Sequence, residues 1–245
     1  MQFQNELLLV LSVALCFGGL LVMFRMFGKT GVFAWTVLET ITANIEVLML
    51  VKAFGMEMTL GNTLFASSFL ATDILSELYG KKEADKGVWL GIASTLLFII
   101  ISLTWQLYIP SENDISAPQI RAVFAVTPRV MCASLIAYFA SEFFDVWLYH
   151  RIWNATTNRC NNSTRFLWLR NNVATLSAQF VNTVVFTLLA FWGMYTAGTF
   201  VSIIVSTYAI YVITSFLDTP FLYLARHIGG RFLKPGATRQ AVPTL

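Results

Sequence analysis

The amino-acid sequence predicts an all-α polytopic membrane protein. Three observations lead to this class: an apolar composition, a series of apolar segments of membrane-spanning length, and basic residues in alternate connections. Of the 245 residues, 57% are hydrophobic and only 12% are charged, whereas about a quarter of the residues in an ordinary soluble domain are charged. The mean hydropathy is +0.67. A soluble fold has too few polar residues here to cover its surface, so we exclude a soluble protein.

Seven segments have the length that a helix needs to cross a bilayer, which is about 20 residues. The segment at 88–109 contains no charged residue and is the clearest of them. The segment at 121–149 is long for one crossing and contains Pro128, so we expect a kink or a protruding helical end there. The seven predicted spans are residues 6–26, 32–54, 60–79, 88–109, 121–149, 172–194 and 200–224.

Lysine and arginine recur in every second connection between these spans. They cluster near residues 25–29, 81–86 and 151–170 and again in the tail, whereas the connection at 110–119 is acidic. Cytoplasmic loops carry an excess of Lys and Arg. We therefore expect the C-terminus in the cytoplasm, with residues 229–245 as a basic cytoplasmic tail, and the N-terminus outside.

Several polar side chains fall inside the predicted spans. Inserting one Asp or Arg at a helix centre costs about 2.5–3.5 kcal/mol, and such residues face the interior of a bundle and mark functional sites. Asp73 and Glu77 are four residues apart and share one helical face. Five polar residues lie deep enough to favour a site: Asn44, Asp73, Arg129, Gln179 and Asn182. Three others lie near cytoplasmic helix ends, where a carboxylate can also pair with a loop arginine: Glu77, Glu142 and Asp145.

We expect Glu39 to be shallow and Asp218 to be interfacial or structural. Carboxylates accept hydrogen bonds from N–H groups, and side-chain amides both accept and donate. A carboxylate can take two adjacent N–H donors of a guanine-like edge side by side. Aromatic residues, 15% of the chain, can stack on a flat ring. The set therefore suits a small, planar, polar heterocycle better than a bare ion.

Catalysis is poorly supported by the sequence. The two histidines, His150 and His227, have no Cys or His partner at metal-ligand spacing, so we predict no metal site, no cofactor and no catalytic residue. The sequence contains no nucleotide-binding motif, so coupling to ATP would need a separate subunit.

Five sequence blocks resemble the queuosine precursor transporters, also called the vitamin uptake transporter family. They are FLATDILSELYGKKEA at 69–84, ANIEV at 43–47, RVMCASLIAYFASEFFDVWLYHR at 129–151, WLRNNVATLSAQFVNTVVFTLLAFWG at 168–193 and LDTPFLYLAR at 217–226. The resemblance implies a six-helix core at residues 31–228, similar to the substrate-binding components of energy-coupling-factor transporters. It implies that residues 1–30 are an extra N-terminal transmembrane helix.

The resemblance also implies uptake of a 7-deazaguanine for tRNA modification, such as 7-cyano-7-deazaguanine, 7-aminomethyl-7-deazaguanine or queuine. The family's substrate-binding positions carry over to Asn44, Asp73, Glu77, Arg129, Glu142, Asp145 and Gln179. Two residues depart from the family pattern, because Asn182 stands where an Asp is expected and Tyr211 where members often have a Lys. The two lost charges are of opposite sign, so the changes could compensate for each other as a former ion pair, or they could retune which precursor is accepted.

We therefore predict a multi-pass importer of a queuosine precursor in the cell inner membrane. In this hypothesis Asp73, Asn44, Gln179 and Asn182 hold the base edge, and Arg129 and Glu142 fix or gate the cavity. The expected partners are the 7-deazaguanine and membrane lipid, with no nucleic acid bound directly and a homo-oligomer left open. The alternatives are a substrate-binding subunit that needs a separate ATPase module and a membrane-embedded enzyme that uses the paired acids. The driving force, proton coupling or facilitated diffusion, is open at this point.

Overall fold

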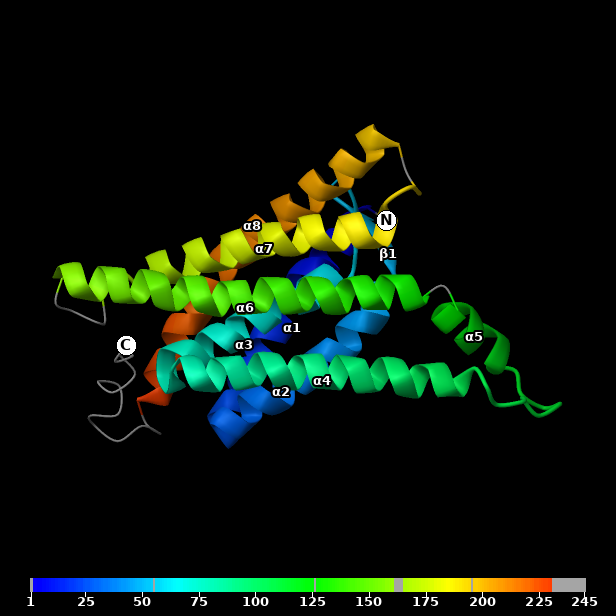
Figure 1. The fold of residues 1–245 in the computed structure, drawn as a ribbon, viewed down its shortest axis with the longest axis horizontal. Helices are drawn as coiled ribbons and strands as arrows, with labels where there is room; N and C mark the ends of the chain where they lie inside the picture. Colours follow the sequence, from blue (N-terminus) through cyan, green and yellow to red (C-terminus); the bar gives the residue numbers. More distant parts are fainter. Residues whose placement is uncertain (1, 55, 126, 161–164, 195, 231–245) are drawn as a thin grey trace.

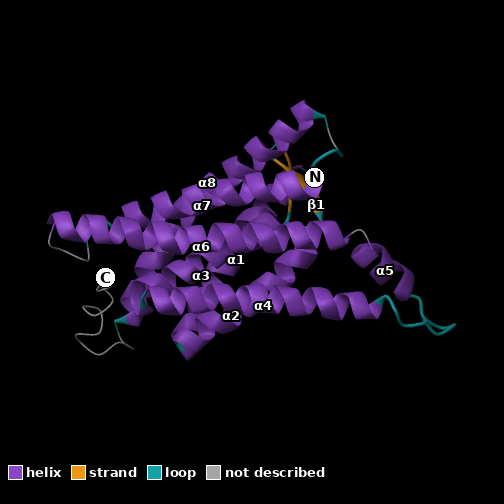
Figure 2. Cartoon of the chain, in the orientation of Figure 1, coloured by secondary structure: helices purple, strands orange, loops and turns teal. Residues whose placement is uncertain are grey.

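The computed structural model describes residues 2–54, 56–125, 127–160, 165–194 and 196–230, and these form a bundle of helices with one small hairpin (Figure 1, Figure 2). The helices are α1 (Gln2–Phe27), α2 (Lys29–Glu46), α3 (Gly61–Tyr79), α4 (Lys81–Trp105), α5 (Ala117–Ala125), α6 (Thr127–Cys160), α7 (Leu167–Phe191) and α8 (Ala197–Gly229). The hairpin consists of β1 (Leu50–Ala53) and β2 (Met56–Thr59).

Five helices of the described chain are long and apolar enough to cross a membrane, namely α1, α4, α6, α7 and α8. This confirms the prediction of a largely helical, multi-pass membrane protein. The helices α2 and α3, which cover two of the seven predicted spans, are not among the five. Nearly all residues of α3 are buried, its polar residues included. It packs against α1, α2, α4, α6 and α8. A helix that neighbouring helices shield from lipid on all sides needs no apolar surface, and α3 can therefore carry the polar groups of the bundle interior.

The predicted second span, 32–54, was wrong at its C-terminal end. The helix α2 ends at Glu46, and the next apolar residues pair as an antiparallel hairpin, with Leu50 opposite Thr59 and Ala53 opposite Met56. A short apolar run is compatible with helix and with strand by periodicity alone. Tertiary contact with α1 fixes the hairpin here, since the Phe54 amide donates to Glu6 Oε1 at 3.0 Å. The hairpin also makes the fold slightly less than all-α.

The single span predicted at 121–149 is two helices. The short helix α5 ends at Ala125, and α6 begins at Thr127 and continues past residue 149 to Cys160, so the protruding helical end is confirmed. Pro128 is the second residue of α6. A proline is tolerated at this place because the first N–H groups of a helix have no partner within the helix.

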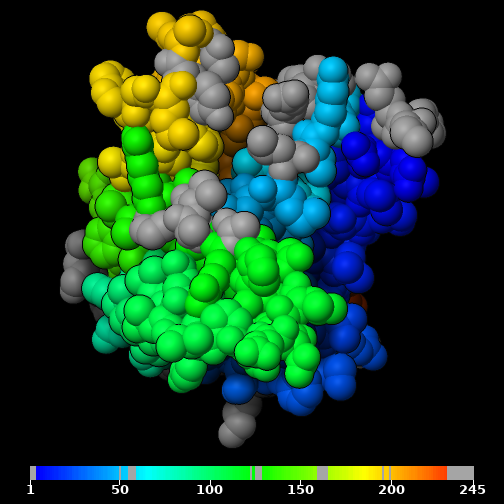
Figure 3. Space-filling view, turned by 90° about the vertical axis from the view of Figure 1, so that its right-hand side faces the viewer, coloured from blue at the N-terminus to red at the C-terminus, as the bar shows by residue number. Residues whose placement is uncertain are grey.

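The two ends of the bundle differ in charge. At one end, which we call the basic end, α1 turns into α2 at Gly28 and α3 turns into α4 at Gly80. Both glycines have positive φ angles, 58° and 84°, which side chains other than glycine rarely adopt. Lys29 pairs with Glu83 there at 2.9 Å. The opposite end, the hairpin end, carries the hairpin and α5. Figure 3 looks onto it and shows the cyan hairpin segment between the blue α1 and the green segment that leads into α5.

The basic end is the one that the lysine and arginine pattern assigns to the cytoplasm, although the orientation in the membrane stays a prediction. Residues 231–245, most of the predicted tail, lie outside the described residues.

The helix α1 packs against α2, α3 and α8, and its Phe17, Leu20 and Phe24 are fully buried. The division into an extra helix at 1–30 and a six-helix core also stays a prediction, and in this chain α1 shares the common core.

Candidate functional site

Buried polar side chains follow α3 through the interior of the bundle, and we call this set the polar column. None of its members is more than 8% exposed. It has three levels from the hairpin end to the basic end. The amide level consists of Asn44, Asn62, Gln179, Asn182 and Tyr211, the acid level of Asp73, Glu142, Asp145 and Asp218, and the ion-pair level of Glu77, Tyr149 and Arg170.

Three members of the amide level line a cavity of about 40 Å³ between α2, α3, α6, α7 and α8. Asn62, Asn182 and Tyr211 supply its polar wall, and Phe65 and Phe186 supply aromatic rings. A smaller cavity of about 10 Å³ shares part of this wall and is lined by Asn44 and Tyr138. A cavity of about 10–15 Å³ can hold one water molecule, whereas pockets for drug-sized ligands have volumes of roughly 300–1,000 Å³. The cavity must therefore expand before it can hold a bicyclic base.

The two residues that are expected to depart from the family pattern, Asn182 and Tyr211, are neighbours in this cavity. Asn182 Nδ2 lies 3.5 Å from Tyr211 Oη, and that hydroxyl donates to Asn62 Oδ1 at 3.3 Å. A neutral chain of hydrogen bonds thus connects α7, α8 and α3. If the two lost charges compensated for each other as a former ion pair, the two residues would have to be in contact, and they are.

Four polar side chains of α7 follow one another at spacings of three or four residues and so lie on one helical face: Asn171, Thr175, Gln179 and Asn182. Asn171 Nδ2 donates to Asp218 Oδ1 at 2.7 Å, and Thr175 Oγ1 donates to Asp73 Oδ2 at 3.2 Å. Asn182 contacts Tyr211, as described above. Gln179 is the exception, because neither its amide oxygen nor its amide nitrogen has a hydrogen-bond partner among the described residues.

The acid level collects four carboxyl groups from α3, α6 and α8, each at most 1% exposed. Glu142 is hydrogen-bonded by two hydroxyl groups of α3, from Ser68 and, at 3.0 Å, from Thr72. Asp73 lies close enough to interact electrostatically with Asp145 and Asp218. Asp145 lies beside Thr175, yet neither of its oxygens has a hydrogen-bond partner in the described chain.

The ion-pair level closes the column at the basic end. Glu77 Oε2 accepts hydrogen bonds from Arg170 Nη2 at 2.5 Å and from the Tyr149 hydroxyl at 2.8 Å. Arg226 Nη1 approaches Glu77 Oε1 at 3.6 Å. The Arg170 guanidinium also lies over the ring of Trp153, 4.4 Å from its centre. These groups satisfy one another, as the members of a structural ion pair do.

The structure brings together all but one of the residues that the sequence predicted for the site. Arg129 is the exception. It is exposed at the start of α6, at the hairpin end, and it donates to the Leu189 and Trp192 carbonyl oxygens at 2.9 and 2.8 Å. The expectation that Arg129 lies deep was wrong, because α6 begins only at residue 127 and leaves Arg129 in its first turn.

Two acidic residues that sequence reasoning left outside the site lie inside the bundle. Glu39 is fully buried, and Asp218 is 1% exposed and accepts a hydrogen bond from Asn171, which fits the structural alternative expected for Asp218. The spacing of Thr36, Thr40 and Asn44 along α2 carries a signal for Glu39, since these buried residues define the face on which it lies. Asn62 and Thr175 were not predicted at all. Each is a single uncharged polar residue in a helix, which is too common a feature to indicate a site.

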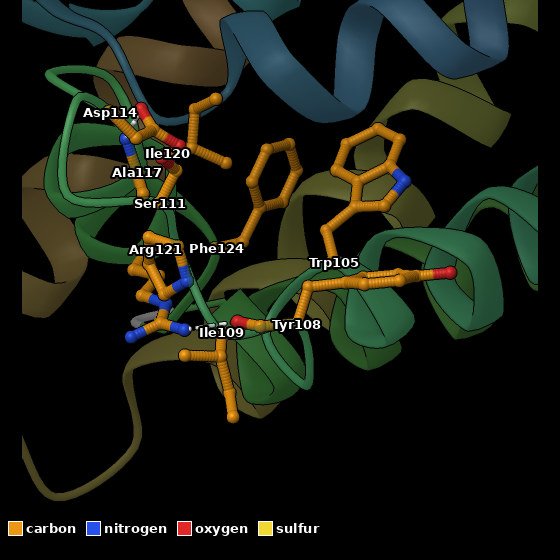
Figure 4. A pocket seen from close by; sticks show the side chains of 10 residues that line it. Trp105, Tyr108, Ile109, Ser111, Asp114, Ala117, Ile120, Arg121 and Phe124 are labelled. Carbon is orange, nitrogen blue, oxygen red and sulfur yellow. Dashed lines mark hydrogen bonds between the residues drawn. The ribbon is translucent and has the colours of Figure 1, made fainter.

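A larger cavity than these two lies elsewhere, at the hairpin end (Figure 4). It measures about 460 Å³ and is lined by Trp105, Tyr108, Arg121, Phe124 and their neighbours. Figure 4 shows the Arg121 guanidinium donating to the Tyr108 carbonyl oxygen. None of the residues predicted for the site lines this cavity, and several of its walls are exposed loop residues such as Ile109. We therefore regard the polar column as the candidate site.

Comparison with known proteins adds the class of activity. Residues 59–225 match the protein family described as "Putative vitamin uptake transporter". The chain belongs to the vitamin uptake transporter family. It is 38% identical over 206 residues, 84% of this chain and 88% of the relative, to the "Probable queuosine precursor transporter" of Bacillus subtilis (strain 168). It is 27% identical over 153 residues, 62% of this chain and 63% of the relative, to the "Queuosine precursor transporter" of Escherichia coli (strain K12).

No solved structure matches the chain, and the predicted similarity to the substrate-binding components of energy-coupling-factor transporters stays a prediction. The family and both relatives are named for transport and not for catalysis. This member of the vitamin uptake transporter family is therefore a membrane transporter and not an enzyme. In the described residues, no three His, Cys, Asp or Glu side chains are placed to hold a metal ion.

Proposed function

We propose that this transporter imports a queuosine precursor of the 7-deazaguanine class, which binds at the amide level of the polar column. The names of the two relatives support the substrate class. The observation that carries the assignment to this site is a set of buried polar atoms with no partner among the described residues: Asn62 Nδ2 and Gln179 Nε2 as donors, and Asn44 Oδ1, Gln179 Oε1 and both Glu39 oxygens as acceptors.

A buried polar atom without a partner costs about 1–3 kcal/mol. A ligand that supplies the missing partners recovers this free energy, so such atoms favour a ligand of complementary chemistry. The edge of a 7-deazaguanine presents a carbonyl oxygen and several N–H groups. The carbonyl suits the two amide donors, and the N–H groups suit the amide and carboxylate acceptors.

The size of the column also fits a bicyclic base. Seven residues of α7 separate Thr175, which bonds to Asp73, from Asn182 in the cavity wall. At a rise of 1.5 Å per residue this is about 10 Å, with Gln179 between the two. The aromatic rings of Phe65, Phe186 and Tyr138 line the cavities and provide flat surfaces on which a base can stack. Asp73 then holds the deep edge of the base, and Asn182 holds its outer edge.

The column also suggests the direction of entry. The cavities lie toward the hairpin end, and the ion-pair level lies at the basic end, which the distribution of Lys and Arg assigns to the cytoplasm. In this proposal the base enters from the hairpin end while the ion-pair level is closed, and it leaves when Glu77 and Arg170 separate. The protein would then lie in the cell inner membrane with its C-terminus in the cytoplasm.

The experiment is to express this chain alone in a bacterial strain that cannot make queuosine precursors and lacks its own importer. The cells are fed 7-cyano-7-deazaguanine, 7-aminomethyl-7-deazaguanine or queuine in turn, and the queuosine in their tRNA is measured. We expect restored queuosine with at least one precursor and without any added ATPase subunit. No queuosine with any of the three would remove the proposed substrate class.

The variant Asp73→Ala tests the site within the same experiment. We expect it to abolish uptake while the protein is still extracted from the membrane as a folded species, because the substitution removes the acceptor for the deep edge of the base. The matched control is Asp114→Ala, at an exposed aspartate of the hairpin end, which should take up the precursor as the unmodified protein does. Unchanged uptake by Asp73→Ala would take Asp73 out of the site.

A further inference from the structure

We propose that Asp73 and Asp145 share a proton that is transported together with the base, so that the proton gradient across the membrane drives import. This inference rests on the proposed function and adds the coupling ion, its binding site and the driving force. The site consists of two interacting carboxyl groups, from α3 and α6, that both lie near the Thr175 hydroxyl.

The carboxyl oxygens of Asp73 and Asp145 have too few hydrogen-bond donors around them. Thr175 has one hydroxyl hydrogen, and it donates this to Asp73 Oδ2. The other Asp73 oxygen and both Asp145 oxygens have no donor among the described residues. Both carboxyl groups are completely buried. A hydrogen bond between two oxygen atoms needs a hydrogen on one of them. One proton added to the Asp73–Asp145 pair supplies this missing hydrogen.

The second step is the absence of a compensating cation at the pair. In the described part of the chain, none of the ion pairs involves Asp73 or Asp145. The groups that interact with the pair are the carboxyls of Glu142 and Asp218 and, with Asp73, the Tyr149 hydroxyl. At the neighbouring ion-pair level, Arg170 and Arg226 both pair with Glu77, and Glu39 of α2 is another buried acid. Two adjacent buried carboxyls without a cation cannot both be ionised, so they retain a proton.

The third step is independent of the acids. Uncharged polar groups near Asp218, which itself interacts with the pair, also lack partners although they are buried. Asn171 donates to Asp218, but its amide oxygen has no donor, and Ser215, on the same face of α8 as Asp218, has a hydroxyl without any partner in the described chain. Both side chains are fully buried. A water molecule or hydronium that carries a proton to the pair would satisfy such groups.

The position of the pair explains how proton and base are coupled. Neither Asp73 nor Asp145 lines the two cavities. In this proposal the expanded cavity brings the base to Asp73, and Asp145 stays out of contact with the base. When a base N–H donates to Asp73, the proton of the pair moves to Asp145. When the ion-pair level opens, Arg170 separates from Glu77, and its charge stabilises both carboxylates, so the proton and the base are released together at the basic end. The pair then takes up a new proton from the hairpin side before the next base binds. The balance requires no other reactant.

The test uses the full chain in lipid vesicles with radiolabelled 7-cyano-7-deazaguanine, a neutral base whose own charge does not follow pH. Exchange of labelled for unlabelled base at equal pH on both sides tests the proposed function by itself. Accumulation under an imposed pH difference, acidic outside, tests the coupling. One proton for each base predicts about tenfold accumulation for each unit of pH difference, since a tenfold concentration ratio balances one such unit.

The variant Asp145→Asn should lose this accumulation while exchange persists above that of empty vesicles. The control Asp114→Asn should accumulate the base as the unmodified protein does. A proton ionophore should abolish accumulation in the unmodified protein. Accumulation that ignores the pH difference, that follows a sodium gradient instead, or that survives in Asp145→Asn overturns the inference even if exchange proceeds normally.

A ligand-free measurement decides the inference if no exchange is found and the proposed function therefore fails. The infrared spectrum of the purified protein contains the carbonyl stretch of every protonated carboxyl group. We expect such a band in the unmodified protein and a weaker band in Asp145→Asn, with no change in Asp114→Asn. A spectrum without this band, or one that Asp145→Asn leaves unchanged, overturns the proton site.

Discussion

The ion-pair level and the amide level lie within one column and along one central helix, but they differ in how far their polar groups are hydrogen-bonded. At the ion-pair level, Glu77 receives hydrogen bonds from Arg170 and Tyr149, and Arg170 also stacks on Trp153. At the amide level, Gln179 is equally well buried and has no partner in the described chain. Burial is the same in both regions, so burial alone does not tell a structural group from a binding group.

The difference shows that satisfaction of hydrogen bonds separates the two roles. A fully paired group stabilises the closed bundle, because removing its partner leaves a charge in a medium of low polarity. A buried group without a partner destabilises the protein until a ligand arrives, which is the property of a binding site. We therefore expect substitutions at the two levels to have opposite effects on stability and on uptake.

The largest effect is expected at the ion-pair level. Replacing Arg170 by Gln leaves Glu77 buried without its charged partner, and breaking a buried pair in this way destabilises a protein by about 3–5 kcal/mol. The measurement is thermal unfolding of the purified protein in detergent. The comparison variant is Arg226→Gln, at a side chain that is 25% exposed and 3.6 Å from Glu77, and it should destabilise the protein much less. Equal effects of the two variants would show that the pair is not a closed structural unit.

An intermediate effect, on uptake and not on stability, is expected for Gln179→Leu. The free energy of unfolding should change by less than about 1 kcal/mol or increase, because no hydrogen bond of the described chain is lost. Uptake should fall about tenfold or more, since one missing hydrogen bond to the base is worth roughly 1.4 kcal/mol. The control is Thr183→Val, whose hydroxyl is already bonded to the Gln179 carbonyl oxygen, and its uptake should stay near that of the unmodified protein. Normal uptake by Gln179→Leu would contradict the inference that a buried polar group without a partner marks the binding site.

The smallest effect is expected for Arg129→Ala. Its guanidinium bonds to two carbonyl oxygens near the end of α7, and it is exposed. Exposed charged contacts contribute about 1 kcal/mol or less. Unfolding and precursor uptake are measured as for the other variants, and uptake should stay within about twofold of the unmodified protein because the affected contacts lie outside the polar column. Loss of uptake without loss of folded protein would return Arg129 to the site, where sequence reasoning had placed it.

Much of the fold follows from the sequence because the membrane restricts what a chain can do. An apolar stretch of about 20 residues in lipid has to be a helix, and α1, α4, α7 and α8 fall close to their predicted spans. The exceptions lie at the hairpin end. Residues 50–59 form a hairpin that bonds to α1, and residues 117–125 form a separate and largely exposed helix α5.

The sequence by itself determined the class of protein, the family and most residues of the candidate site. These are properties of composition and local motif, such as FLATDILSELYG around Asp73. Only the tertiary structure decided which of the two acids in that motif is paired. Glu77 meets Arg170 from 93 residues away, and Asp73 meets Thr175 from 102 residues away. The partner of a buried group depends on which helix faces it, and the packing of the helices fixes this, whereas the residue's own neighbours in the sequence do not.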